Sequence, residues 1–61
     1  MNIHKKRALH LLGKERVITS SELAKFLKIS WNTAEKMLLE MVIEGKVDKI
    51  KKAGVNLWML K

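Results

Sequence analysis

Few residues of this 61-residue chain could do covalent or metal chemistry. There is no cysteine, and the two histidines, His4 and His10, would lie roughly 240° apart around a helix. No carboxylate stands at ligand spacing from either histidine, and no glycine-rich phosphate loop is present. Ser20 and Ser21 suit helix capping better than nucleophilic attack. We therefore expect no catalytic, cofactor-binding or metal-binding residue, no small-molecule substrate and no enzyme activity.

Basic side chains are abundant: 13 Lys and Arg against 6 Asp and Glu give a net charge of +7. Residues 45–61 hold five basic residues and one acidic residue, net +4, and residues 1–28 hold seven and two, net +5. Such a balance favours a polyanionic partner, nucleic acid above all, over a role in solubility alone.

The length fits one small domain, residues 1–61. With 48% apolar residues and no proline the chain is expected to fold, and its thin core leaves a homodimer open. The longest apolar runs are too short for a bilayer span or a signal peptide, so we expect a cytoplasmic protein with no membrane partner. The absence of cysteine and glutamine, with abundant Lys, Ile and Leu, is a weak sign of a thermophile-like composition.

Apolar periodicity predicts a first helix from Ile3 to Leu12 that ends at Gly13. Val17-Ile18 then forms a very short strand or an extended linker. Thr19 and Glu22 have the spacing of a capping box, which predicts the start of a second, short helix.

A third helix is expected from Ser30 to Glu44, because apolar residues recur there at i, i+3, i+4 and i+7 and Gly45 provides an end signal. The period then changes to two, which predicts a β-hairpin around the tight turn Ala53-Gly54. In the expected register Ile50 faces Leu57, Lys49 faces Trp58 and Val47 faces Leu60. This register turns Val47, Trp58 and Leu60 towards the helices.

The second and third helices share a distinctive pattern, carried by Leu23-Ala24, Leu27-Lys28-Ile29-Ser30, Thr33-Ala34, Met37-Leu38, Met41, Gly45 and Val47. With the order helix, short strand, helix, tight turn, helix and hairpin, this pattern resembles the winged helix-turn-helix family over nearly the whole chain. Ala24 is small where the two helices would cross, Ile29 would plug the turn, and Ser30 would cap the next helix. Lys28 departs from the glycine common at that turn position, at a cost of about 1 kcal/mol. The resemblance implies a mainly α fold of three helices with a small β-hairpin.

In that family the third helix enters the major groove of double-stranded DNA and the hairpin wing contacts the backbone. The resemblance therefore implies a small transcription regulator that uses helix 30–44 in the groove and wing 49–56 on the phosphates. Base contacts carried over by position are Trp31, Asn32 for adenine, Glu35 for cytosine, and Lys36 for guanine or phosphate. The backbone contacts that we expect are Lys28, Ser30, Thr33, Lys49, Lys51 and Lys52, the wing lysines because of the basic charge of residues 45–61.

The charge of the third helix supports a second interpretation. Residues 29–44 hold one lysine and three glutamates, net −2, which is unusual for a helix that reads DNA. Leu39 and Ile43 share its outward face, where they either contact a protein or pack under the wing, and the small size of the chain favours burial. A protein contact there would indicate a winged-helix interaction module, a small subunit of replication or transcription machinery.

Two further alternatives stay open at this stage. Trp31 either meets DNA or folds back over the second helix as a lid on the core. Asn32, Glu35 and Lys36 either read bases or form a solvated face.

Overall fold

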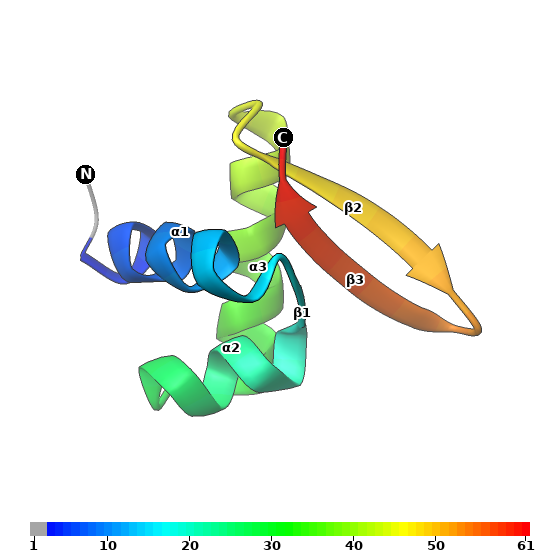
Figure 1. The fold of residues 1–61 in the computed structure, drawn as a ribbon. Helices are drawn as coiled ribbons and strands as arrows, with labels where there is room; N and C mark the ends of the chain where they lie inside the picture. Colours follow the sequence, from blue (N-terminus) through cyan, green and yellow to red (C-terminus); the bar gives the residue numbers. More distant parts are fainter. Residues whose placement is uncertain (1–2) are drawn as a thin grey trace.

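The structure, a computed structural model, describes residues 3–61 and has a winged-helix topology (Figure 1). Three helices pack together, and a three-stranded antiparallel sheet extends from one side of them as a long hairpin. In chain order the elements are α1 (Ile3–Glu15), β1 (Val17–Thr19), α2 (Ser20–Leu27), α3 (Trp31–Ile43), β2 (Val47–Lys52) and β3 (Val55–Leu60).

The first helix is longer than the sequence predicts, and the expected end at Gly13 is wrong. Helix α1 continues to Glu15, and Arg16 takes the left-handed conformation with φ of 73°. The Arg16 N–H donates to the Leu12 carbonyl at 2.9 Å, and the Leu12 side chain is buried. The helix therefore continues through Gly13, at a cost of roughly 1 kcal/mol for glycine inside a helix, and Arg16 takes the left-handed position that ends it.

The start of α2 has the predicted capping box. Thr19 Oγ1 accepts from the Glu22 N–H at 3.1 Å, and Glu22 Oε1 accepts from the Thr19 N–H at 2.8 Å. The same helix ends at Lys28, whose φ of 58° and ψ of 46° are left-handed, as expected for this turn. Lysine therefore accepts here the strain that glycine would avoid.

The sheet has the order β1-β3-β2, with β3 in the centre. The hairpin register is the predicted one: Val47 pairs with Leu60, Lys49 with Trp58 and Ile50 with Leu57. The two-residue turn consists of Ala53 and Gly54, both with positive φ, 52° and 79°, as a type I′ turn requires.

The core lies where the three helices meet the base of the hairpin. Trp58 is fully buried and Val47 is 1% exposed, so both face the helices as predicted. Leu60 stays 40% exposed, and it lies over the backbone of α1 near Gly13. The other buried apolar residues are Ala8, Leu12, Ile18, Leu23, Ala24, Leu27, Ala34, Met37, Leu38 and Met41. In residues 3–61 no helix is long and apolar enough to cross a membrane.

An ion pair ties the start of α1 to the end of α3. Lys5 Nζ donates to Glu44 Oε2 at 2.9 Å and lies 3.5 Å from Glu40 Oε1. The hydrogen bond with Lys5 lowers the pKa of Glu44, and the hydrogen bond with Glu44 raises the pKa of Lys5. Glu44 thus stabilises the fold above the pKa it has in the unfolded chain, and that contribution is lost as the pH falls through its lowered pKa.

Glu44→Gln should therefore reduce the free energy of unfolding near pH 7. The difference from the wild type should shrink at acidic pH, as the pH falls through the lowered pKa of Glu44 and its carboxylate becomes protonated in the folded state too. Urea unfolding near neutral and at acidic pH measures this. Asp48→Asn is the matched control, because Asp48 is exposed and forms no ion pair within residues 3–61. An equal pH dependence in both variants would contradict the assignment.

Candidate nucleic-acid interface

Helix α3 presents one stripe to the core and the opposite stripe to solvent. Its buried side chains are Ala34, Met37, Leu38 and Met41. The helical period of 3.6 residues places Asn32, Lys36, Leu39 and Ile43 on the far side, and all four are exposed. The outward stripe is therefore polar in the N-terminal half of the helix and apolar in the C-terminal half.

The N-terminus of α3 is held by the hydroxyl groups of two residues that the sequence analysis expects to contact the DNA backbone. Ser30 Oγ accepts from the Thr33 N–H at 3.2 Å, and the two hydroxyl groups of Ser30 and Thr33 lie 2.8 Å apart. Both residues are exposed. Their capping bonds fix the first turn, and each hydroxyl keeps a lone pair or a proton for an outside partner.

Trp31 lies half-exposed at the start of α3, with 49% of its surface accessible. It lines a groove of about 330 Å³ whose other walls include Ser21 from α2 and Lys51 and Asn56 from the wing. The indole is therefore no closed lid on the core. It forms one wall of an open groove between the start of α2 and the tip of the hairpin.

A chain of polar contacts, which we call the polar clamp, joins α2, α3 and β3 through Ser20, Glu35, Asn56 and Trp58. The buried Trp58 Nε1 donates to Ser20 Oγ at 2.9 Å, and Ser20 Oγ donates to Glu35 Oε1. Asn56 Nδ2 donates to the other carboxylate oxygen of Glu35 at 2.7 Å. The wing is thereby bonded to the face of α3 that lies beside it.

The polar clamp gives Glu35 a structural role that the sequence analysis missed. Both of its carboxylate oxygens already accept a hydrogen bond, so a contact with cytosine would have to share one of them. A sequence signal did exist, because a Trp in the core needs a partner for its N–H. Sequence reasoning assigned Ser20 to capping and gave Asn56 no role.

The three acidic residues of segment 29–44 all have partners within the chain. Glu35 belongs to the polar clamp, and Glu40 and Glu44 lie against Lys5. The outward stripe of Asn32, Lys36, Leu39 and Ile43 carries no acidic residue. Each of these three carboxylates therefore has a hydrogen-bond or ion-pair partner within the fold, and Glu40 lines the same groove as Thr33 and Lys36.

The wing separates the three lysines that the sequence groups together. Successive residues of a strand point to opposite faces, so Lys49 and Lys51 project from the helix-facing side with Val47 and Trp58. Lys52 projects from the outer side with its partner Val55. Within residues 3–61 none of these three lysines forms an ion pair. The inner face of the wing therefore offers two free cations beside α3.

The expectation that Leu39 and Ile43 pack under the wing is wrong. Ile43 is 86% exposed and Leu39 is 39% exposed. Val42, one position before Ile43, is the side chain that packs against the core. Burial under the wing therefore does not account for the apolar character of this part of the outward stripe.

Metal ligands do not gather in the described part of the chain. In residues 3–61 no group of three or more His, Cys, Asp or Glu side chains could hold a metal ion. The arrangement at α3 and the wing is instead one of hydrogen-bonding groups and unpaired cations over an open groove.

Comparison with known proteins bears on the fold. No protein-family model matches the chain, and no curated protein matches it. Among solved structures the chain is similar to the crystal structure of AntR, an antimony-specific transcriptional repressor, with a TM-score of 0.88 and 13% sequence identity. The similarity covers 98% of this chain and 54% of the AntR chain, so this chain spans about half the length of that neighbour.

Glu35→Ala should remove the acceptor for both Ser20 and Asn56 and lower the free energy of unfolding by about 1–3 kcal/mol. The control is Glu40→Ala, whose half-exposed ion pair with Lys5 should contribute less than about 1 kcal/mol. Urea unfolding followed by the fluorescence of the buried Trp58 and the half-exposed Trp31 measures both. Equal losses in the two variants would show that the polar clamp does not hold the wing.

Proposed function

We propose that this chain binds double-stranded DNA as a small transcription regulator, with the N-terminal half of α3 in the major groove and the wing on the backbone. One observation carries the proposal: the polar half of the outward stripe and the unpaired lysines of the inner wing face lie on the same side of the molecule. The neighbour AntR, a transcriptional repressor by its title, supports the same class of function through its shared fold.

In this proposal base contacts come from the exposed first turns of α3. Asn32 pairs with adenine through its amide, and Lys36 contacts guanine or a phosphate. Trp31 stands at the edge of the groove between α2 and the wing, where it packs against the sugar and base edges. Glu35 contributes by orienting α3. It accepts a hydrogen bond from cytosine only if one of its carboxylate oxygens accepts two hydrogen bonds at once.

Backbone contacts in this proposal come from both ends of the interface. Lys28, Ser30 and Thr33 cluster around the turn before α3, and Lys49 and Lys51 extend the surface along the inner wing face. Lys52 stays a candidate at the tip, although its strand position turns it to the outer face. Each phosphate contact releases counterions, which makes affinity depend steeply on salt.

Neighbouring lysines on opposite faces of one strand provide the test. Lys51→Ala should weaken binding to every duplex and lower the slope of log K against log salt by about 0.9, the value for one phosphate contact. Lys52→Ala removes the same charge from the outer face and should change the slope less. Fluorescence anisotropy with a labelled duplex over a salt series measures both. Equal slopes in the wild type and Lys51→Ala would remove the inner wing face from the interface.

A second candidate function rests on the exposed apolar half of the outward stripe. An isoleucine with 86% of its surface accessible, next to a partly exposed leucine on the same helix face, is typical of a contact with another protein. In this alternative Leu39 and Ile43 dock on a partner of the replication or transcription machinery, or on a second copy of the chain.

Ile43→Glu tests this alternative without disturbing the core. Because the side chain is exposed, the free energy of unfolding should change by less than about 0.5 kcal/mol. If the face docks on a second copy, self-association measured by sedimentation should be lost in Ile43→Glu and kept in Ile3→Glu, which alters another exposed isoleucine. A monomeric wild type, or a dimer that survives Ile43→Glu, would rule out self-association through this face.

A further inference from the structure

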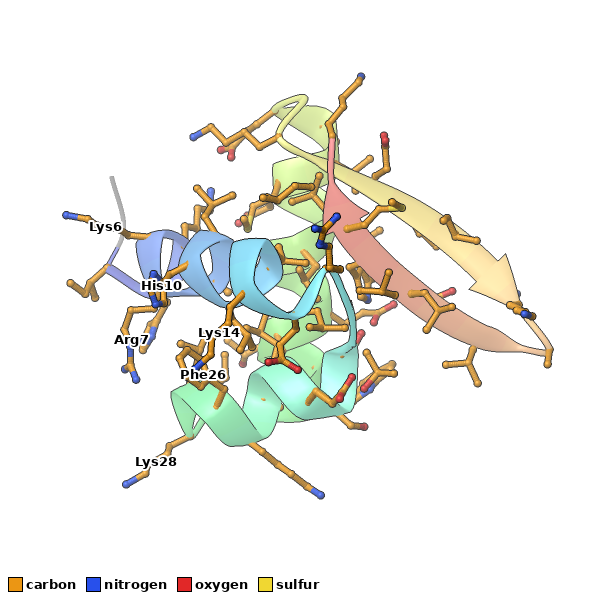
Figure 2. The ribbon with its side chains drawn as sticks, in the orientation of Figure 1. Lys6, Arg7, His10, Lys14, Phe26 and Lys28 are labelled. Carbon is orange, nitrogen blue, oxygen red and sulfur yellow. The ribbon has the colours of Figure 1, made fainter. Side chains whose placement is uncertain are left out.

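Helix α1 carries a second basic surface that the proposed DNA interface does not use. Lys6, Arg7, His10 and Lys14 recur at the helical period, so they share the solvent-facing side of α1, and all four are exposed. Figure 2 shows them projecting from α1, with Phe26 of α2 close to Arg7. We call Lys6, Arg7, His10, Lys14 and Phe26 the front face.

The front face has no acidic partner. Lys6, Arg7 and Lys14 form no ion pair with any other residue in the part of the chain the structure describes. Glu22, one helical turn before Phe26, is held in the capping box with Thr19. The positive charge of this surface is therefore uncompensated within the fold.

An aromatic ring orients the only arginine of the front face. The Arg7 guanidinium lies 5.1 Å from the centroid of the Phe26 ring, in cation–π geometry, and Phe26 is 38% exposed. The contact limits the motion of a long side chain, so less conformational entropy is lost when its planar fork binds a phosphate.

The front face points away from α3. Lys5, on the other side of α1, reaches back to Glu40 and Glu44 of α3, so the outward side of α1 faces the opposite way. In Figure 1 α1 lies at the left, in front of α3, and the wing extends to the right, away from α1. Lys28 also stands apart from the front face, beyond the end of α2 (Figure 2). A duplex seated on α3 and the wing would leave the front face uncovered.

We propose that the front face binds the phosphate backbone of a second DNA duplex, so that one chain bridges two DNA segments. The proposal rests on the proposed function for its first duplex. Lys6, His10 and Lys14 follow one another every four residues and span about 12 Å along the helix axis. The cations Lys6, Arg7 and Lys14 on this convex helix surface match the dense, repeated charges of a duplex backbone, one per about 1.7 Å of its axis.

The number of duplexes bound per chain tests this inference. Sedimentation of the wild type with excess duplex of about 12 base pairs, slightly more than one helical turn, should give two duplexes per chain at low salt. The variant K6E/K14E should bind one. The matched control K46E/K61E changes the charge by the same amount outside the front face and should still bind two. Circular dichroism verifies that each variant is folded.

The affinities separate the two surfaces. K6E/K14E and K46E/K61E should bind their first duplex with the same Kd within about threefold, because both lose the same net charge. The variant K49E/K51E should lose the duplex on α3 and the wing and keep the one on the front face.

Four outcomes would overturn the proposal that the front face binds a second duplex. If the wild type binds one duplex per chain and K49E/K51E binds none, the proposed function stands and there is no second site. If K6E/K14E still binds two duplexes per chain, the second duplex does not bind at the front face. One duplex that is lost only in K6E/K14E overturns the proposed function and bridging together. Displacement of the second duplex by a glutamate peptide of equal charge, as readily as by unlabelled duplex, assigns the front face to an acidic protein.

Discussion

The position of the wing depends on how the indole N–H of Trp58 is satisfied in the core. Trp58 is fully buried at the centre of the sheet, and an unpaired N–H there would cost about 1–3 kcal/mol. Ser20 Oγ accepts a hydrogen bond from the indole and donates one to Glu35, which also accepts one from Asn56. The hydrogen bonds that begin at the indole N–H thus connect residues of α2, α3 and β3. The face of α3 beside the wing is therefore joined to the core by a continuous chain of hydrogen bonds.

This arrangement also accounts for the charge of α3. By composition, residues 29–44, with three glutamates and one lysine, are a poor match for DNA, but each of these glutamates has a hydrogen-bond or ion-pair partner within the fold. Lys36 is left as the charged group of the outward stripe. The cations of α1, by contrast, form a surface of their own, which the same fold turns in the opposite direction.

Much of the fold could be predicted from the sequence because its signals are local. The capping box at Thr19, the turn at Ala53-Gly54 and the hairpin register all depend on neighbouring residues, and all three predictions are confirmed. The end of α1 was predicted wrongly, because the left-handed residue that ends the helix is Arg16 and not the glycine at position 13. The role of Glu35 was missed for a different reason: Glu35 and Asn56 are 21 residues apart, and only the packed sheet brings them together. Whether α3 reads DNA stays a prediction, since neither spacing nor exposure identifies the partner.

The most direct test of the account is a titration of the isotope-labelled protein with duplex DNA, followed by two-dimensional NMR below one equivalent of duplex. A surface made of α3 and the inner wing face predicts that the largest amide shifts fall on Asn32, Lys36 and Lys51, and that they fade as salt is raised. Shifts confined to the region of Leu39 and Ile43, or the absence of any shift at low salt, would contradict the assignment of this surface to DNA.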